Sequence, residues 1–334
     1  MASVSVIVPT YERVDLLREA LRSALAQTYE DFVVLVGDNS ESDRAENVVC
    51  EFDDPRIRYH RNRPGLGGQG NWLDLVARAE TPLVASLHDD DVWHRDFLAE
   101  TVPQMLAEPD IAMTFTDFWM IDGDGTRLDD YTNAECLRTH RSAMPRGRYD
   151  YTRAEGLRLV AVWNAPQPAY AAVLRRDPIL AIDFPDDISP LYDIWISYRL
   201  VMQNLGLFYV PRRLTNYRIH RGAVTSSGFA RAEDAVFGRI IEENADAGPV
   251  ADEIKAYLAS LQWSRATQLM ANGRLSRAAS QHQMREAVDH LEGPKRAAAL
   301  VGGHVGPAWH ALRFARDLRH RVGEGPDARD VVSS

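Results

Sequence analysis

Three consecutive carboxylates, Asp89, Asp90 and Asp91, follow a short apolar run at residues 83–87. The run contains neither Gly nor Pro, which is typical of a buried strand. Adjacent carboxylates at the end of such a strand repel one another and require a compensating cation. Oxygen ligands on an acidic turn suit Mg²⁺ or Mn²⁺ holding a phosphate-bearing substrate. The alternative is a solvated turn that caps a helix beginning near Asp96, but three carboxylates behind a strand favour the metal site.

Strands and helices alternate in the part of the chain that must position this turn. Strands are expected at residues 3–8, 32–37, 57–60, 83–87 and 111–116, and helices at about 16–27, 41–52, 71–79 and 96–107. This alternation predicts an α/β fold with a parallel, right-handed sheet. Residues 64–70 are expected to form a flexible loop. In a sheet of this kind ligands bind at the carboxyl ends of the strands, where the acidic turn lies.

The second half of the chain is less regular. Strands are expected at residues 170–174, 208–210 and 214–219, with a helix at 191–204. The segment Asp122-Gly-Asp-Gly125 is interpreted as a hairpin turn, because the twelfth position of a calcium loop would be Asn133 rather than Glu. Residues 126–160 are expected to be an irregular loop that could hold an acceptor. From about residue 230 the composition predicts a helical appendage.

Composition limits the possible partners and compartments. The chain has 334 residues and a formal net charge of −10, without a dominant basic cluster in its first half, which disfavours a nucleic-acid partner. Its two cysteines, Cys50 and Cys136, indicate neither a disulfide framework nor a zinc site. No apolar window is long enough for a membrane span and no leader pattern is present, so we expect a cytoplasmic protein.

The same patterns predict three regions: an α/β domain at residues 1–228, a helical region at 229–322 and a disordered end at 323–334. We expect the helical region to pack or to form a homodimer. The basic amphipathic stretch at residues 309–321 makes membrane contact a less favoured alternative.

Seven short motifs occur in an order that resembles the inverting family 2 glycosyltransferases. They are VIVPTYER at 6–13, DNS at 38–40, DPRIRY at 54–59, GNW at 70–72, LHDDDVW at 87–93, YDIW at 192–195 and YRIH at 217–220. The resemblance covers roughly residues 3–225 and implies a GT-A fold, a Rossmann-like and mostly parallel sheet flanked by helices. It also implies a nucleotide-sugar half at residues 1–115 and an acceptor half at 116–228.

The resemblance implies an activity and its reactants. A sugar would move with inversion from a nucleoside diphosphate sugar, with UDP- or dTDP-sugars expected, to an acceptor hydroxyl, with Mn²⁺ or Mg²⁺ as cofactor. The acceptor could be a glycan, a lipid-linked glycan or a natural product. The residues implied to bind the nucleotide sugar are Pro9, Thr10, Tyr11, Arg13, Asp38, Asn71, Asp89 and Arg218.

Within that set the resemblance assigns separate roles. Thr10 and Tyr11 would lie along the base and ribose, and Asp38 would accept a hydrogen bond from either. An aromatic ring and one acceptor are also what a nucleobase site needs physically. The alternative for Tyr11 is a half-buried residue that packs against its helix. Asp89 would lie near the ribose.

The implied metal site combines the acidic turn with a late histidine. Asp90 would bind the metal, Asp91 would be an outer or acceptor-side group of that site, and His220 would be a further metal or diphosphate ligand. Arg218 and Arg221 beside His220 could neutralise the leaving diphosphate. His88 stands where the family has an acid, and is expected only to hydrogen-bond a neighbour.

The catalytic base is less clearly indicated. The family usually supplies an Asp two residues before a motif like that at 193–195, where this chain has Pro190 and Leu191. Asp193 is the expected base, with Asp186 or Asp187 as alternatives and an unusually nucleophilic acceptor as a third. The resemblance also implies acceptor contacts from Trp163, Asn164 and Gln167.

Two rival functions remain open. A sugar nucleotidyltransferase would need a Gly-rich turn and Lys or Arg directly after the first strand, where this chain has Pro9 and Thr10. A non-catalytic nucleotide-sugar-binding or scaffold protein is favoured only by Leu191 at the position of the family's Asp.

Overall fold

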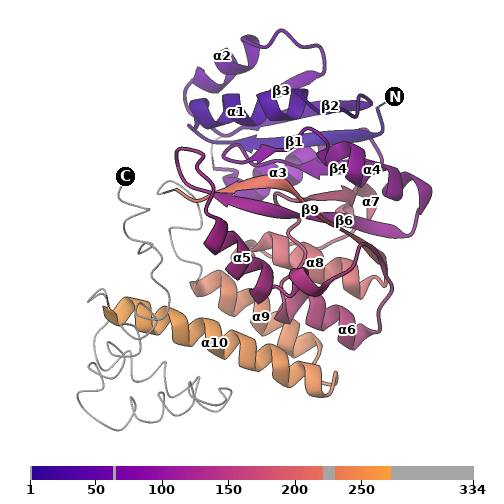
Figure 1. Ribbon diagram of the computed structural model, residues 1–334. Coiled ribbons are helices and arrows are strands. Elements are labelled where there is room, and N and C mark those ends of the chain that lie inside the picture. Colours follow the sequence, from indigo (N-terminus) through magenta and orange to yellow (C-terminus); the bar gives the residue numbers. More distant parts are fainter. Residues whose placement is uncertain (1, 63–64, 221–229, 272–334) are drawn as a thin grey trace. The chain divides into compact units, whose positions relative to one another are not determined.

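The computed structural model describes residues 2–62, 65–220 and 230–271 (Figure 1). The chain divides into two compact units, Met1–Gly228 and Phe229–Ser334. The first unit contains the acidic turn and every residue proposed for a site.

The first half of this unit is a parallel sheet in the order β3-β2-β1-β4. Its strands are β1 (Val4–Thr10), β2 (Phe32–Asp38), β3 (Ile57–Arg61) and β4 (Leu83–Ser86), and its connecting helices are α1 (Val14–Leu25), α2 (Arg44–Cys50) and α3 (Gly67–Arg78). Thr10 lies opposite Asp38 in the register of β1 and β2. The carboxyl ends of these strands therefore meet at one edge, as the alternation in the sequence predicts.

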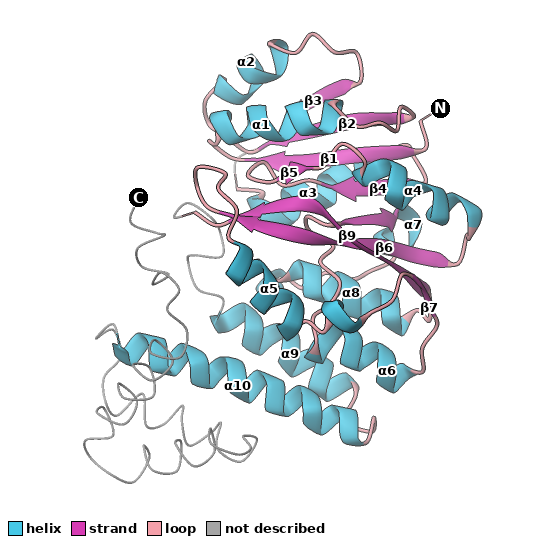
Figure 2. Ribbon diagram, viewed as in Figure 1, coloured by secondary structure: helices cyan, strands magenta, loops and turns pink. Residues whose placement is uncertain are grey.

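The second half extends the sheet through antiparallel and parallel pairs. The full order is β3-β2-β1-β4-β8-β6-β9-β5, with β7 (Gly147–Tyr149) paired to β9. The added strands are β5 (Val92–Trp93), β6 (Ile111–Ile121), β8 (Ala172–Arg175) and β9 (Gly206–Arg218). Helices α4 (Phe97–Ala107), α7 (Arg176–Leu180) and α8 (Tyr192–Met202) follow in the same unit, and helices lie on both sides of the sheet (Figure 2). The expected α/β fold is confirmed.

Alternation along the strands decides which helix covers which face of the sheet. Val6 and Val8 of β1 belong to one buried cluster with Leu17 and Leu21 of α1. Ile7 between them points to the opposite face, where α3 packs against β1 and β2. Burying each of these side chains contributes roughly 1.5–3 kcal/mol to folding. The sheet is thus covered on both faces at β1 and β2, which leaves the ends of these strands for a binding site.

The expectation of an irregular loop at residues 126–160 is wrong. The segment forms α5 (Asp129–Arg138), the short η1 helix (Arg141–Ala143), β7, α6 (Arg153–Leu157) and the π-helical turn η2 (Arg158–Val162). A capping box starts α6, because the Thr152 side chain accepts from Glu155 N while the Glu155 carboxylate accepts from Thr152 N. Tertiary packing orders a stretch whose polar composition carries no clear helical period.

Two further boundaries differ from the sequence prediction. The strands expected at 208–210 and 214–219 are one strand, β9, which continues through an exposed Pro211 where the pairing register with β6 shifts. Helix α3 begins at Gly67, inside the stretch expected to be a flexible loop.

The second unit is helical over its described part. Helices α9 (Ala230–Glu243) and α10 (Pro249–Ala271) pack against each other, with the rings of Phe237 and Tyr257 5.5 Å apart. The helical expectation is confirmed as far as residue 271; the rest of that prediction, including the stretch at 309–321, lies outside the described residues. Among the helices of the described ranges, none is both long enough and apolar enough to cross a membrane.

Candidate active site

The acidic turn closes directly after β4 and is tied to the end of β1. The backbone N–H of Asp91 donates to the carbonyl of His88 at 3.1 Å, which forms the turn. Asp89 Oδ2 accepts from Thr10 Oγ1 at 2.7 Å and from the backbone N–H of Tyr11 at 3.3 Å. Asp89 and Thr10, which sequence analysis placed beside the ribose, are therefore in direct contact.

Two basic side chains that are far apart in the sequence, Arg13 and His220, contact the acidic turn. Arg13 Nη1, from the loop before α1, donates to Asp89 Oδ1 at 3.0 Å and to Asp90 Oδ2 at 2.7 Å. His220 Nε2, from just after β9, lies 3.0 Å from the same Asp90 oxygen. The structure thus brings together the predicted residues Arg13, Asp89, Asp90 and His220. Arg221 lies outside the described residues.

Arg218 is buried and forms hydrogen bonds to the acidic turn, so its side chain is not open to solvent. Its backbone N–H donates to Asp91 Oδ1 at 2.9 Å and its Nε donates to the Asp90 carbonyl at 2.9 Å. Its Nη1 donates to the Gly123 carbonyl at 2.9 Å, and its Nη2 donates to Glu19 Oε2 at 2.6 Å. The side chain is only 3% exposed. Diphosphate binding by Arg218 stays a prediction, while the hydrogen bonds show a structural role that the sequence did not indicate.

Burial and the repulsion between neighbouring carboxylates give the three aspartates of the turn different pKa values. Burial and the neighbouring Asp90 raise the pKa of Asp89 to about 6, against the effect of Arg13. The same causes raise the pKa of Asp91 well above its usual value. Burial also opposes ionisation of Asp90, but the hydrogen bond with His220 and the charge of Arg13 outweigh it and lower the pKa of Asp90. Asp90 is accordingly the carboxylate best suited to carry negative charge.

The ligand-bearing atoms of this turn fit a divalent cation. One ligand atom from each of His88, Asp90 and Asp91 lies within 4.8 Å of the other two. Asp91 Oδ2 is buried and has no hydrogen-bond partner among the described residues. An oxygen in that situation costs free energy unless a cation or water approaches it. Mixed carboxylate and imidazole donors are chemically suited to a divalent transition metal.

The neighbouring edge of the sheet is shaped by Asp38 and Asn71. Asp38 is fully buried, and its two carboxylate oxygens accept from Tyr59 Oη and from the backbone N–H of Ser40, both at 2.7 Å. Asn71 Nδ2 donates to the Gly37 carbonyl at 2.8 Å. A Cβ on Gly37 would lie 2.2 Å from Asn71 Oδ1, so a larger residue cannot replace it without movement. Tyr59 is a site residue that its place on the strand beside β2 could have indicated.

The loop after β1 exposes one aromatic ring above this edge. Tyr11 is 59% exposed, unusual for a large aromatic residue, and the chain after it turns at Glu12, whose φ is +57°. A left-handed backbone at a residue other than Gly costs about 1–2 kcal/mol, and such strain gathers at functional sites. Glu12 Oε1 accepts from the backbone N–H groups of Glu41 and Ser42 at 3.1 and 3.3 Å. Glu12 therefore fixes the loop that follows β2, a contact that sequence analysis missed.

Helix α8 contacts the acidic turn through its first residue, Tyr192. His88 Nε2 lies 3.1 Å from Tyr192 Oη, and the Tyr192 ring packs 5.5 Å from that of Trp72. The next residue, Asp193, has a buried Oδ1 without a hydrogen-bond partner in the part of the chain that the structure describes. Burial raises the pKa of Asp193 to about 6. Asp193 is thus a poorly solvated carboxylate of the kind that can accept a proton near neutral pH.

The other predicted base candidates lie on the surface. Asp186 and Asp187 are exposed residues of the short η3 helix (Asp186–Ile188), which precedes α8. Their loop touches α3, where Gln69 Nε2 donates to the Pro185 carbonyl at 3.4 Å.

The predicted acceptor residues lie on a segment that passes the end of β4. Trp163 stacks on His140 with ring centroids 4.6 Å apart, and Gln167 Nε2 donates to the Asn164 carbonyl at 2.9 Å. Further along, the Ala169 carbonyl accepts from Ser86 Oγ, the last residue of β4, at 2.6 Å. This hydrogen bond fixes the segment to β4 at Ser86, two residues before His88, where the turn begins.

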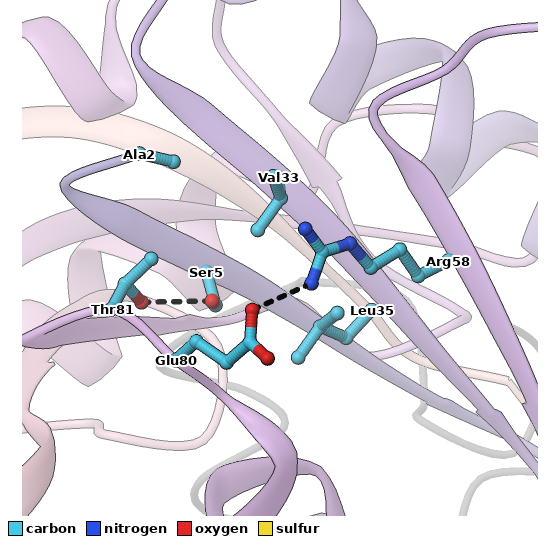
Figure 3. Close-up of a pocket in the computed structure, with 7 residues that line it drawn as sticks. All are labelled: Ala2, Ser5, Val33, Leu35, Arg58, Glu80 and Thr81. Carbon is cyan, nitrogen blue, oxygen red and sulfur yellow. Dashed lines mark hydrogen bonds and ion pairs between the residues drawn. The ribbon is translucent and has the colours of Figure 1, made fainter.

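A separate pocket lies away from these residues (Figure 3). Its lining comes from the starts of strands, including Ser5 of β1 and Val33 of β2, and from Thr81 just before β4. Ser5 Oγ and Thr81 Oγ1 are hydrogen-bonded at 2.8 Å, and Arg58 pairs with Glu80 at 3.0 Å. Because parallel strands point the same way, this pocket is at the edge opposite the acidic turn.

Comparison with known proteins decides the family. The model of glycosyl transferase family 2 matches residues 5–164, which include β1, the acidic turn and Arg13. The matched part of the chain, residues 5–164, belongs to glycosyl transferase family 2. The match ends before β8, α8 and β9, so it does not itself cover Asp193, Arg218 or His220.

Two curated relatives are similar to part of this chain. A putative teichuronic acid biosynthesis glycosyltransferase, TuaG from Bacillus subtilis, is 28% identical over 42% of this chain and 56% of its own length. WfgD from Escherichia coli, a glucosyltransferase acting on a sugar linked to diphosphoundecaprenol, is 32% identical over 31% of this chain and 41% of its own. The matches thus span about half the length of these relatives.

Solved structures agree in fold. TarS from S. aureus in complex with UDP-GlcNAc superposes with a TM-score of 0.61 at 18% identity, covering 96% of this chain and 89% of that one. A mannosyltransferase from Pyrobaculum calidifontis, solved with GDP-Man and Mn²⁺, gives a TM-score of 0.55 at 17% identity, covering 95% and 80%. At this identity the likeness establishes the GT-A-type fold, which confirms the expectation from the sequence.

Proposed function

We propose that the protein is a metal-dependent, inverting glycosyltransferase. It would move a sugar from a nucleoside diphosphate sugar to an acceptor hydroxyl. The observation that carries the proposal is the convergence of Thr10, Arg13, Asp89, Asp90 and His220 at one edge of a family 2 domain. Nucleotide sugars bound to two structural neighbours support the donor class.

The donor would lie across the carboxyl ends of β1, β2 and β4. Tyr11 offers an exposed ring to the base, and the strand-end carboxylate Asp38 is held beneath it by Tyr59. Pro9 at the end of β1 shapes the same wall, and Asn71 keeps the end of β2 in place. Asp89, fixed by Thr10, is the acceptor proposed for the ribose hydroxyls. A UDP- or dTDP-sugar remains the proposed donor.

The diphosphate would lie beside Arg13 and His220, the basic side chains that contact the turn. Arg13 and His220 both reach Asp90 and can offer hydrogen bonds to phosphate oxygens beside it. Asp90, Asp91 and His220 are the residues proposed to hold Mn²⁺ or Mg²⁺, and the unpartnered Asp91 Oδ2 fits that role. When bound, the ion would offset the charge that develops on the leaving diphosphate.

The chemical step requires a group that removes the acceptor proton. The acceptor oxygen would attack the anomeric carbon while the bond from that carbon to the diphosphate oxygen breaks, and the hydroxyl proton would pass to Asp193. Its elevated pKa makes this carboxylate a competent base near pH 7. Asp187 is the alternative proposal, because its loop is exposed and directly precedes the helix of Asp193.

The acceptor is proposed to contact Trp163, Asn164 and Gln167. Relatives that act in teichuronic acid biosynthesis or on diphosphoundecaprenol-linked sugars support a glycan or lipid-linked glycan as its class. A cytoplasmic location and a homodimer through the second unit belong to the same proposal. Membrane contact through the C-terminal helices is the less favoured alternative.

A donor panel tests this function. UDP-, dTDP- and GDP-sugars are incubated with the full chain, Mn²⁺ and glycan acceptors, and release of nucleoside diphosphate is followed together with the anomeric configuration of the product by NMR. Inversion with at least one donor is expected. Binding of a nucleotide sugar without turnover on any acceptor would instead favour the non-catalytic reading, to which Leu191 at the position of the family's Asp points.

A further inference from the structure

His88 has a place in the acidic turn that the expected hydrogen bond to a neighbour does not by itself explain. One of its ring nitrogens lies within 4.8 Å of ligand oxygens of both Asp90 and Asp91. No other group of three or more His, Cys, Asp or Glu side chains in the described ranges has this spacing. Asp91, a member of the same cluster, has a buried Oδ2 for which the described residues offer no hydrogen-bond partner, which is a separate observation that suits an approaching cation.

The surroundings of His88 also match those of a metal-binding imidazole. Ligating histidines usually donate their second ring N–H to an oxygen, which fixes the ring and the tautomer. Here His88 Nε2 lies 3.1 Å from Tyr192 Oη. Donation from Nε2 to this hydroxyl leaves Nδ1 with the free lone pair.

Tyr192 is itself held in position. Its ring packs against Trp72 at 5.5 Å, and the Trp72 indole N–H donates to Ser86 Oγ at 2.9 Å. Burial raises the pKa of Tyr192, so the phenol stays neutral and can accept a hydrogen bond. The orientation of His88 is therefore supported by a chain of three contacts, from His88 to Tyr192, from Tyr192 to Trp72 and from Trp72 to Ser86.

We propose that His88 is a direct ligand of the metal in this site and that it makes the site select Mn²⁺ over Mg²⁺. The inference rests on the proposed function and concerns which ion serves it. Mg²⁺ is bound by oxygen ligands, whereas imidazole nitrogen suits transition metals. A site that has His88 in place of a carboxylate exchanges a hard oxygen donor for an imidazole nitrogen, and this exchange weakens Mg²⁺ more than Mn²⁺.

Mn²⁺ provides a direct spectroscopic test, because nitrogen directly bound to it produces a ¹⁴N modulation in pulsed electron paramagnetic resonance. The full chain is measured with Mn²⁺ alone and with Mn²⁺ plus UDP. His220 is a second imidazole beside Asp90, so its contribution is removed with the His220→Asn variant. The ¹⁴N modulation is expected to persist in this variant and to disappear when His88→Asp is added.

Competition between the two ions tests the selectivity. Displacement of bound Mn²⁺ by Mg²⁺ is followed through the signal of free Mn²⁺. The wild type is expected to require at least 100-fold more Mg²⁺ than Mn²⁺ for half displacement, and His88→Asp is expected to lower that ratio about tenfold or more. His88→Gln serves as a second variant without the carboxylate, and His60→Gln on β3 is the matched control in which neither readout changes.

The outcomes separate this inference from the function on which it rests. Wild-type protein that binds Mn²⁺ while His220→Asn shows no ¹⁴N modulation would overturn the role of His88 and leave the glycosyltransferase proposal standing. An unchanged Mn²⁺ to Mg²⁺ ratio in His88→Asp would also overturn it. Wild-type protein that binds no Mn²⁺ under either condition would contradict the metal dependence itself.

Discussion

The backbone N–H of Arg218 donates a hydrogen bond of 2.9 Å to Asp91 Oδ1, which ties the last residue of β9 to the acidic turn after β4. The Arg218 side chain strengthens this tie through the carbonyls of Asp90 and Gly123 and through Glu19. Residues more than a hundred positions apart in the chain are therefore held as one unit. The turn is positioned by the second half of the domain as much as by its own strand.

Loss of the Arg218 guanidinium should destabilise the domain. Arg218→Ala removes three side-chain hydrogen bonds from a group that is 3% exposed, and we expect the free energy of unfolding to fall by about 2–4 kcal/mol. Urea denaturation of the full chain measures this. The matched control is Arg58→Ala, whose ion pair with Glu80 is on the surface (Figure 3) and should cost less than about 1 kcal/mol.

Arg218→Lys distinguishes positioning from a contact with the diphosphate. Lys keeps the positive charge but cannot reproduce the fork of hydrogen bonds. If Arg218 acts by holding the turn, Arg218→Lys should weaken Mn²⁺ binding and stability together. Retention of wild-type stability with a loss confined to nucleotide affinity would contradict the positioning role.

Asp193 should give the reaction its pH dependence. A base with a pKa of about 6 is protonated and inactive below that pH, so kcat/KM should rise with pH through a limb centred near 6. Asp193→Asn should lower kcat by about 10²–10⁴-fold and abolish the limb. Initial rates of nucleoside diphosphate release between pH 5 and 9 measure both. A fully active Asp193→Asn enzyme would remove Asp193 as the base, and Asp187→Asn is the comparison that tests the alternative.

The same substitution should make the protein more stable at neutral pH. Because the pKa of Asp193 is higher in the folded chain, at about 6, than its ordinary value of 3.8, the folded state holds the proton more tightly. The free energy of unfolding therefore falls as pH rises between these two values, and the full penalty is present above pH 6. Asp193→Asn should remove a penalty on the order of 1–3 kcal/mol at pH 8 and have little effect near pH 4. Equal destabilisation at both pH values would argue against a poorly solvated carboxylate.

Tyr11 should matter for nucleotide affinity and not for folding. Stacking of an aromatic side chain on a base contributes about 1–3 kcal/mol, so Tyr11→Ala should weaken nucleotide binding roughly 10-fold or more. With the ring 59% exposed, the unfolding free energy should change by less than about 0.5 kcal/mol. Calorimetric titration with UDP measures the affinity, and Tyr11→Phe should retain it. Equal loss of affinity and stability would favour the alternative that Tyr11 packs against its helix.

Local sequence patterns were sufficient to predict the first half of the fold. Apolar runs such as that around Val6 and the helical spacing of Leu17 and Leu21 are written in consecutive residues, and the family motifs add the order of the strands. The fold of residues 126–160 could not be predicted in the same way, because its helices are stabilised by packing and by a single capping box at Thr152.

The same distinction between local and long-range interactions applies to the residues of the candidate site. The acidic turn, Thr10 and Asp38 stand at strand ends and are visible in the sequence. The contacts of Arg218 with Glu19, of Glu12 with the loop after β2, and of His88 with Tyr192 join distant segments, and no local pattern indicates them. Tyr59 is intermediate, since the strand prediction places it near Asp38 but not its hydroxyl on the carboxylate.

The central claim is that Asp90 and its neighbours bind a nucleoside diphosphate together with a divalent cation. Isothermal titration of UDP, dTDP and GDP into the full chain, with Mn²⁺ and then with EDTA, tests it most directly. Asp90→Asn is measured alongside, with Asp177→Asn on the exposed start of α7 as the matched control. We predict that at least one nucleotide binds in Mn²⁺, and that EDTA and Asp90→Asn each weaken binding at least 10-fold while Asp177→Asn does not. No binding by any of the nucleotides, or equal binding in EDTA and in Asp90→Asn, would contradict the account.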